Sequence, residues 1–560
     1  MKNIQQFKDS NFIIALIGFV LVIFSLSSIY TADFHLINTS AVSFQDPNGE
    51  LLIGEYTPGG KDRGVILLEG FGSDQIALKS IKSEFVKIGF HAFSFDFSGQ
   101  GKSPGILGFD NAATERLAQQ VLSAKEYFKT ISGLNDSEII LLGHSMGARV
   151  ALQAAAIDSH NVSGLILIGA QVNLQTNIQA GFFTGVSDTE LEWVQNLNTT
   201  NPPTDILLLS GMWDDIITPT AANLLYEKLG GSLSPYKREL IIYDFLFHNY
   251  EIYSPQLITD ALNWAVINTG LESSPNYFAT NTLLRKIFWI TACIGLFLIP
   301  IFGLRFSKRK STKSENGEKT SEIERKIVID DINKFLKYKL ILWLGAIPIA
   351  LFMLTAFMLI PIGIPIFSLF YVGFIGSYGL LMIFLYTRER LPGTQGKLRI
   401  NLKPNLKNWN SNSIITIVIA LIFIILAALF FNSGINYVFP LNDRIIWLII
   451  FTILTIPGFY ISIKEGKMID DQYNQNRKYK LIHTIIGLVP FFGISVLFVA
   501  LGSISGMIGS LQGLLILLFV VLSGSFIYSL EKNLIITIVY QSFLIQFLVL
   551  TQGSLFSIFY

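Results

Sequence analysis

Long apolar runs constrain this chain more than any other feature. A helix needs about 20 apolar residues to cross the ~30 Å hydrocarbon core of a membrane. Stretches of this kind occur at residues 12–30, 287–306, 340–361, 365–386, 414–432, 445–463, 482–501, 506–528 and 533–551. We therefore expect one transmembrane anchor at residues 12–30 and an all-α, eight-helix transmembrane domain within residues 287–560.

Between the first two runs lies a more polar segment, residues 31–286, whose length suits one globular domain. The chain is 51% hydrophobic and 14% charged, too apolar for a soluble protein and too polar for a helix bundle alone. The net charge of +1 does not favour a nucleic-acid partner. The single cysteine, Cys293, excludes an intrachain disulfide and a thiol-based metal site. No metal cluster or cofactor motif is found, so we expect neither.

Lysines and arginines predict the orientation. They gather in residues 305–339, 387–412 and 464–480, and the alternating connections 362–364, 433–443 and 502–505 hold none. Because basic loops stay in the cytoplasm, these three loops and residues 1–11 are predicted to be cytoplasmic. Residues 31–286 are then extracytoplasmic, and the protein is a multi-pass protein of the cell membrane.

Two features of the apolar runs leave alternatives open. Residues 12–30 either form an uncleaved anchor, which we favour because Tyr30 replaces the small residue expected before a cut, or a cleaved signal. The C-terminal runs hold essentially no Asp, Glu, Lys or Arg, with Arg444 and His483 at their edges. Coupled transporters need such groups at membrane depth, which argues against an ion-coupled pump. Prolines in these runs either shape a cavity or are accommodated by neighbouring helices.

Residues 31–286 alternate short β-rich runs with helical patterns. The strand candidates are "ELLIGEY", "GVILLEG", "FHAFSFD", "EIILLG", "GLILIGA", "DILLLS" and "RELIIYD". Between the third and fourth candidates, Leu117, Val121 and Phe128 repeat with a helical period. The alternation predicts an α/β domain with a mainly parallel sheet and helices on both faces.

The stretch "EIILLGHSMGARVALQAAA" contains the pentapeptide Gly143-His144-Ser145-Met146-Gly147 between a predicted strand and a predicted helix. In a G-x-S-x-G elbow, the flanking glycines, Gly143 and Gly147, allow a turn so sharp that the serine hydroxyl stands above the sheet. The strand before it and the helix after it make this match more specific than the pentapeptide alone.

On these motifs, residues 40–270 resemble an α/β-hydrolase, most closely the monoacylglycerol-lipase and serine-aminopeptidase-like branch. The resemblance implies a catalytic triad of Ser145, Asp214 in "GMWDDIITP" and His248 in "LIIYDFLFHNYE", with Asp215 as the alternative acid. The chemistry of serine explains why three residues are needed. A serine hydroxyl is a poor nucleophile until an imidazole takes its proton, and a carboxylate must orient that imidazole.

The stretch "GVILLEGFGSDQ" resembles the family's oxyanion loop, which implies Phe71 and Met146 as backbone N–H donors, with Gly70 and Gly72 allowing close approach. Glu69 stands where the family usually has histidine. Its carboxylate either opposes the developing oxyanion or pairs with a neighbour and braces the loop. We favour bracing, because an unpaired buried carboxylate is costly. A further family-like stretch, "FDFSGQGKSPG", is expected to shape the wall of the site, with Asp96 structural.

Residues 171–204 lie where the family carries a cap, and long loops of this kind are usually functional lids. Their large apolar side chains either line an acyl pocket or seal the cap onto the sheet. These are Phe182, Phe183, Leu191, Trp193 and Val194.

Together these features predict a membrane-anchored serine hydrolase that cleaves an ester through an acyl-enzyme. The expected substrate is a membrane lipid or an acylated envelope molecule, because two tethers hold the site near the membrane. A serine peptidase or an acyltransferase would use the same triad. A channel, transporter or scaffold with a sensory hydrolase-like domain is the alternative from another class.

Overall fold

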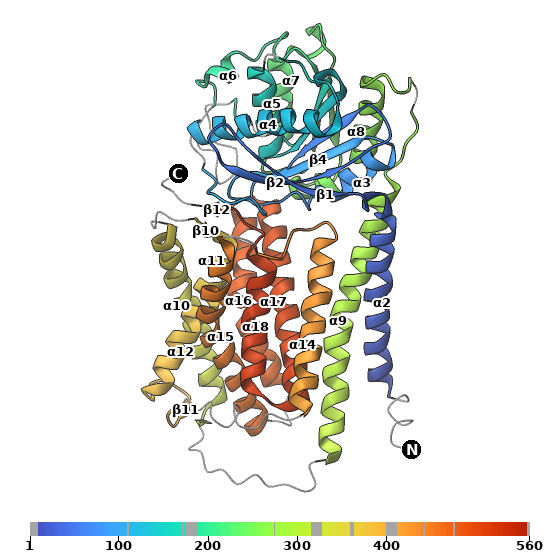
Figure 1. The fold of residues 1–560 in the computed structure, drawn as a ribbon. Helices are drawn as coiled ribbons and strands as arrows, with labels where there is room; N and C mark the ends of the chain where they lie inside the picture. Colours follow the sequence, from blue (N-terminus) through green and yellow to red (C-terminus); the bar gives the residue numbers. More distant parts are fainter. Residues whose placement is uncertain are drawn as a thin grey trace.

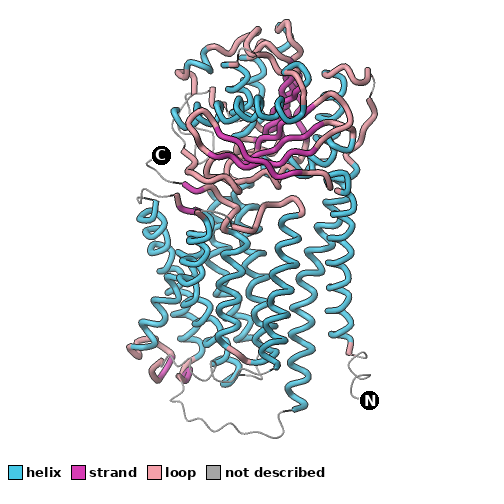
Figure 2. The backbone as a smooth tube through the Cα atoms, in the orientation of Figure 1, coloured by secondary structure: helices cyan, strands magenta, loops and turns pink. Residues whose placement is uncertain are grey.

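An α/β domain stands on one end of a bundle of long helices in the computed structural model (Figures 1 and 2). The described residues are 9–108, 111–158, 160–170, 172–174, 188–273, 275–314, 327–358, 363–398, 411–440, 443–473 and 477–556. Residue 171 and residues 175–187 of the predicted cap, with Phe182 and Phe183 among them, lie outside the described residues, as do parts of the three predicted basic loops.

The α/β domain is built on an eight-stranded sheet with the order β1-β2-β4-β3-β5-β6-β7-β8. Strands β1 and β2 are antiparallel to their neighbours, and β4 to β8 run parallel to one another and to β3. The strands are β1 (Ser40–Gln45), β2 (Leu51–Thr57), β3 (Gly64–Leu68), β4 (His91–Asp96), β5 (Ile139–His144), β6 (Gly164–Ile168), β7 (Asp205–Gly211) and β8 (Arg238–Tyr243). The predicted α/β-hydrolase fold is confirmed. All seven strand candidates form strands, and β1 was not predicted because five of its six residues are not buried.

Helices cover both faces of this sheet, as near-continuous apolar strands require. One core joins Phe93 and Leu141 to Val121 and Phe128 of α4, and the other joins Val65 to Phe85 and Leu257. The helices are α3 (Lys79–Lys87), α4 (Asn111–Ser132), α5 (Met146–Ile157), α6 (Glu192–Gln195), α7 (Pro219–Lys228) and α8 (Pro255–Asn268). The expected helix between the third and fourth strand candidates is α4.

Eight helical spans among the described residues are long and apolar enough to cross a membrane. They are α2 (Ser10–Ala32), α9 (Thr280–Ser314), α10 (Ile332–Met358), the continuous α11 (Ile366–Tyr371), η5 (Val372–Gly376) and α12 (Ser377–Thr387), α14 (Ser411–Asn432), α15 (Arg444–Tyr473), α16 (Arg477–Ala500) and α17 (Ile504–Glu531). The ninth expected span, α18 (Leu534–Val549), has only 16 residues. Asn533 caps its start, and the chain leaves the helix after Val549 to contact the α/β domain.

Helix α2 packs along α9 at a pair of glycines. A Cβ added to Gly18 would lie 2.8 Å from the Leu298 Cβ, and one added to Gly295 would lie 2.6 Å from the Gly18 carbonyl oxygen. Small residues let membrane helices approach closely in this way. Helix α9 begins at Thr280, inside the segment 31–286 predicted for the α/β domain, and its Arg285 pairs with Asp33 just after α2.

The apolar runs are essentially uncharged, as the sequence indicates, but the helices that contain them bury charged residues beyond the ends of the runs. Helices α10 and α15 continue beyond their apolar runs and bury Lys339 and Glu465, which form an ion pair. His483 of α16 lies 3.1 Å from the Glu465 carboxylate, and the Tyr386 hydroxyl donates to the same carboxylate at 3.1 Å. Mutual pairing allows these charges to be buried, so the limits of the apolar runs did not mark the limits of the helices.

Candidate active site

Ser145 lies in the sharp turn between β5 and α5. Its φ of 55° and ψ of −116° are strained for a residue other than glycine, as the elbow predicts. A Cβ on Gly143 would lie 2.4 Å from the Gly147 carbonyl oxygen, and one on Gly147 would lie 2.3 Å from the Leu68 carbonyl oxygen. Gly143 is therefore required by the close approach of the first turn of α5, and Gly147 by the packing of that turn against the end of β3.

The structure brings Ser145, His248 and Asp214 together, each after its own strand. The Ser145 Oγ lies 2.8 Å from the His248 Nε2, and the His248 Nδ1 lies 2.7 Å from the Asp214 Oδ2. The Asp214 Oδ1 accepts from the backbone N–H groups of Ile216 and Ile217, which fixes the carboxylate. All three side chains are buried.

Asp215, the alternative acid, points elsewhere. Its carboxylate accepts from the backbone N–H of Ser505, at the start of α17, at 3.1 Å, and from the Ser505 hydroxyl. Of the two neighbouring aspartates, Asp214 is therefore the one in contact with the histidine.

Two further ionisable residues adjoin the triad, and sequence reasoning did not assign them a role. The His144 Nε2 lies 3.2 Å from the His248 carbonyl oxygen, and burial, with the nearby His248, lowers the pKa of His144 to about 3. Glu251 accepts from the Gly211 N–H, and its other oxygen lies 3.8 Å from the His248 Nδ1. Burial, and then Asp214, raise the pKa of Glu251 well above the usual glutamate range. The only sequence signal for Glu251 is its position three residues after His248.

Among the described residues, His144, His248 and Glu251 form a group whose ligand atoms lie within 4.8 Å of one another. A metal ion there would compete with Ser145 and Asp214 for the nitrogens of His248. The arrangement therefore suits proton transfer better than metal binding.

The predicted oxyanion loop lies against the nucleophile. A Cβ on Gly70 would be 3.2 Å from the Ser145 Cβ, and Gly72 has a φ of +70°, which favours glycine. Met146 is the first residue of α5, and the first N–H groups of an α-helix have no acceptor within the helix. The loop and the helix start thus lie on two sides of Ser145, as the resemblance implies.

Glu69 is fully buried and contacts the loop after β4. Its Oε1 accepts from the Phe97 N–H at 2.8 Å and from the Gln100 Nε2 at 3.0 Å. Burial, and then the neighbouring Asp96, raise the pKa of Glu69 well above the usual glutamate range. These contacts fit bracing, and the raised pKa favours a neutral carboxyl that would not oppose an oxyanion.

Gln100 is a residue that sequence reasoning missed. Its Oε1 accepts from the Gly72 N–H at 2.7 Å, and its Nε2 also donates to the Gly70 carbonyl oxygen at 3.2 Å. Asp96, in the same loop, accepts from the backbone N–H groups of Gln75 and Lys102 and so holds the loop, as expected of a structural residue.

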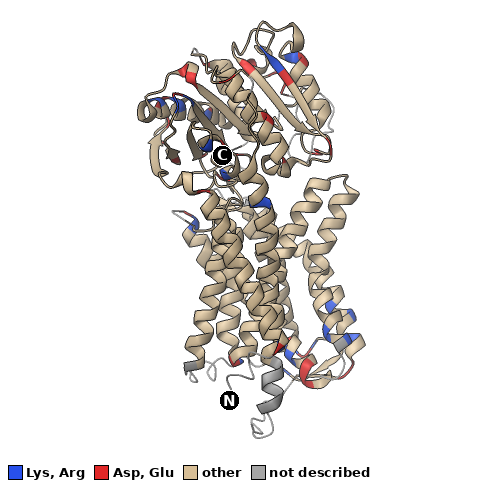
Figure 3. Ribbon diagram, turned by 90° about the vertical axis from the view of Figure 1, so that its right-hand side faces the viewer, with Lys and Arg blue, Asp and Glu red and all other residues tan. Residues whose placement is uncertain are grey.

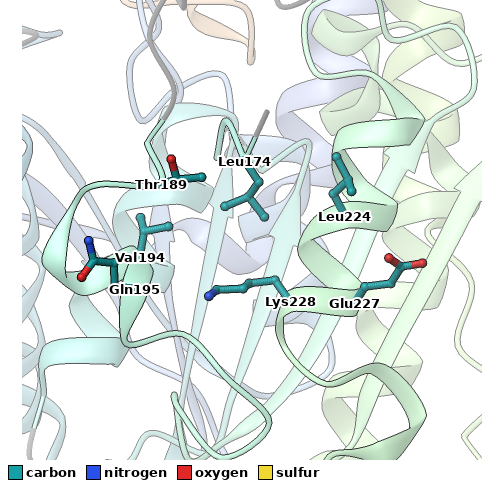
Figure 4. Close-up of a pocket in the computed structure, with 7 residues that line it drawn as sticks. All are labelled: Leu174, Thr189, Val194, Gln195, Leu224, Glu227 and Lys228. Carbon is teal, nitrogen blue, oxygen red and sulfur yellow. The ribbon is translucent and has the colours of Figure 1, made fainter. Parts of the chain in front are cut away.

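In the described part of the cap, large apolar side chains seal it onto the sheet. Trp193 and Val194 are buried in the core, and the Arg149 guanidinium lies 5.4 Å from the Trp193 ring centroid. Figure 4 shows a pocket between this part of the cap and α7 that mixes apolar and polar side chains. It has a volume of about 600 Å³ and is lined by Leu174, Thr189, Val194, Gln195, Leu224, Glu227 and Lys228, so no triad residue lines it.

Comparisons with known proteins agree with this architecture. Residues 60–200 match the family described as serine aminopeptidase, S33. A putative esterase/lipase 2 of Mycoplasma pneumoniae is 26% identical over 117 residues, which are 20% of this chain and 40% of that protein. The chain thus spans two fifths of the length of this relative.

Solved structures are similar over the α/β domain. The esterase Pf2001 of Pyrococcus furiosus has 18% identity and a TM-score of 0.35, covering 41% of this chain and 91% of that chain. An α/β serine hydrolase homologue from Coxiella burnetii has 15% identity and a TM-score of 0.31, covering 41% of this chain and 96% of that chain. The predicted resemblance is confirmed by the family match, together with the strand order.

Proposed function

We propose that this protein is a serine hydrolase of the α/β type and that it cleaves esters through Ser145, His248 and Asp214. The single observation that carries the proposal is the continuous contact from the Ser145 Oγ through the His248 imidazole to the Asp214 carboxylate. A buried serine held this way can be deprotonated as it attacks a carbonyl carbon.

The reaction follows from this geometry. As the Ser145 Oγ bonds to the ester carbon, the His248 Nε2 takes its proton, and Asp214 stabilises the imidazolium. The backbone N–H groups of Phe71 and Met146 would bind the oxygen on which negative charge develops. His248 then protonates the leaving alkoxide, which departs as the alcohol. Water, deprotonated by His248, attacks the acyl-enzyme and releases the acid.

We further propose that the bundle lies in the membrane, that the hydrolase domain is extracytoplasmic, and that the substrate is a membrane lipid or another acylated envelope molecule. The loops after β3, β4, β7 and β8 adjoin the bundle, so the site lies beside the membrane segment (Figure 1). Basic residues of the bundle gather towards the helix ends far from the sheet, where α12 and α15 end (Figure 3). Such residues favour the cytoplasmic side.

A fluorophosphonate probe tests the nucleophile on the purified full-length protein in lipid nanodiscs. We expect labelling of the wild type, none of Ser145→Ala, and full labelling of Ser40→Ala, which removes an exposed hydroxyl at the edge of the sheet. Folded wild-type protein that does not react would contradict the proposal.

The type of bond is tested separately with a phospholipid ester, the matching amide and an added alcohol acceptor. Release of free fatty acid from the ester alone supports an esterase. Cleavage of the amide would favour a peptidase, and acyl transfer to the alcohol would favour an acyltransferase.

A further inference from the structure

Three segments of the catalytic domain that surround the triad bond directly to the membrane helices or their connections. Asp215, next to the triad acid, binds Ser505 at the start of α17. The hydroxyl of Tyr250, two residues after the triad histidine, accepts from the Gln512 side chain of α17 at 2.8 Å. Asp74, which follows the oxyanion loop, accepts from the Tyr437 N–H at 2.7 Å.

The closest connection is made by residues 550–555, which we call the C-terminal segment. Its Leu555 N–H donates to the Gly99 carbonyl oxygen at 2.7 Å, and its carbonyl oxygen accepts from the Leu107 N–H at 3.0 Å. The buried Arg444 donates to the carbonyl oxygens of Gly553 and Gly99, both at 2.8 Å. The C-terminal segment is therefore fixed to the loop that carries Gln100.

Inside this contact, one side chain reaches from the C-terminal segment to the oxyanion loop. The Ser554 hydroxyl donates to the Gln100 Oε1 at 2.8 Å, and the same oxygen accepts from the Gly72 N–H at 2.7 Å. The Gln100 Nε2 donates to Glu69 and to the Gly70 carbonyl oxygen. Ser554, Gln100 and Glu69 are all buried.

The donors and acceptors of a glutamine amide explain why Ser554 matters. The amide oxygen only accepts, and the amide nitrogen only donates. The Gly72 N–H only donates and the Gly70 carbonyl oxygen only accepts, so these two backbone groups fix which way the amide faces. The Ser554 hydroxyl adds a second donor at the amide oxygen and so holds the amide in the place from which that oxygen binds the Gly72 N–H.

We propose that Ser554 is a positioning residue that acts through Gln100 to hold the oxyanion loop, so that the membrane domain completes the active site of the hydrolase domain. The proposal rests on the esterase function proposed above. On this proposal, the Phe71 N–H is aimed at the reacting oxygen only while the C-terminal segment holds the Gln100 amide in place. Loss of this contact would lower the rate of the chemical step without removing the nucleophile.

Two variants of Ser554 with side chains of the same shape test the role of its hydroxyl. Both variants are made in the full-length protein. Ser554→Thr keeps the hydroxyl, and Ser554→Val has the shape of the threonine side chain with a methyl group in place of that hydroxyl. We expect the threonine variant to keep its kcat and the valine variant to lose about tenfold in kcat, with KM changed less than about twofold, because a misaimed oxyanion donor acts on the transition state. Equal kcat values for the two variants would overturn the proposal.

Two further measurements separate positioning from a general loss of packing. Hydrogen exchange of a peptide covering residues 64–75 should be faster in Ser554→Val than in Ser554→Thr, because the Gly72 N–H loses its fixed acceptor. Ser525→Ala, which removes a hydroxyl that bonds only within α17, should leave kcat and exchange unchanged. Unchanged exchange in Ser554→Val would also overturn the proposal.

These experiments distinguish failure of this inference from failure of the proposed esterase function. If the wild type hydrolyses the ester and both Ser554 variants match it, this inference fails and the proposed function stands. If the wild type hydrolyses no ester and Ser145 does not react with the fluorophosphonate, the proposed function itself fails.

Discussion

At the scale of single residues, Glu69 shows how a carboxyl group can adjoin an oxyanion site. Burial, and then Asp96, raise its pKa well above the usual glutamate range, which favours the neutral form, and one of its oxygens accepts from Phe97 and Gln100. A group whose pKa is raised by folding stabilises the fold at low pH, and this contribution is lost as the pH rises through the raised value. Ionisation would also place a negative charge beside the developing oxyanion.

We therefore expect kcat/KM and thermal stability of the wild type to fall as the pH rises above the usual glutamate range and through the raised pKa. In Glu69→Gln, whose amide oxygen still accepts from Phe97, this fall should be absent, and Glu69→Ala should be impaired at every pH. Parallel pH–rate and thermal-unfolding profiles of the three proteins measure this. A loss in Glu69→Gln equal to that in Glu69→Ala at every pH would mean that the charged form does the bracing.

The adjacent aspartates give a second prediction at this scale. Asp214→Asn should lower kcat by about 10⁴, because an amide holds the histidine in the wrong tautomer. Asp215→Asn should have a much smaller effect, since Asp215 contacts Ser505 and not His248. Steady-state kinetics on both variants compare them directly, and equal losses would show that the acid has been assigned to the wrong residue.

How far a residue could be predicted depended on whether its signal was local. Ser145 lies in a pentapeptide with strict glycine spacing, and Asp214 and His248 each follow a recognisable strand. The stretch "FDFSGQGKSPG" pointed to the loop that contains Gln100 but not to this residue, because one of its contacts is with Ser554, which is 454 residues away in the sequence. Composition and periodicity carry no information about a contact of that separation.

At the scale of elements, the glycine contact between α2 and α9 is the most testable. Gly18→Leu should lower the thermal stability of the detergent-solubilised protein by about 1–3 kcal/mol, because the added side chain overlaps the Leu298 Cβ and the Gly295 carbonyl oxygen. The matched control is Gly487→Leu on α16, where an added Cβ meets nothing within 4 Å. Similar melting curves for the two variants would show that close packing of the anchor adds no stability.

The elements were largely predictable, and the exceptions have physical causes. Buried strands such as β3 and β5 can be recognised as apolar runs in the sequence. Strand β1 is a mostly exposed edge strand, and its apolar and polar residues show only a weak pattern. Apolar runs located the long apolar helices but not their ends. Lys339 and Glu465 are buried because they form an ion pair with each other. In a hydropathy pattern each of them is a charged residue at which the predicted span ends.

At the scale of the whole molecule, the prediction concerns orientation. A reporter fused after residue 270 should behave as extracytoplasmic, and one inserted within residues 307–326 should behave as cytoplasmic, because the basic loops favour the cytoplasm. Paired alkaline phosphatase and green fluorescent protein fusions at each site measure this, since each reporter is active on one side only. The reverse pattern would exclude an extracytoplasmic substrate.

The arrangement of the two domains was the least predictable feature. The sequence predicts a hydrolase domain tethered at both ends, and tethers alone leave the direction of the active site open. The direction is set by contacts between residues hundreds of positions apart, such as Asp215 with Ser505 and Gly99 with Arg444. The bundle therefore contacts the loops that carry the candidate active site.

The contact between Gln100 and Ser554 also has a consequence for biosynthesis. The ribosome makes the hydrolase domain first, and at about 5–20 residues per second the 454 residues that separate this pair take roughly 20 to 90 seconds to translate. Throughout that time a nascent chain would carry its nucleophile without the brace on its oxyanion loop. On the function and the inference proposed above, unfinished or truncated chains would be weak hydrolases, and ester cleavage would begin only after the C-terminal segment had been made and had reached Gln100.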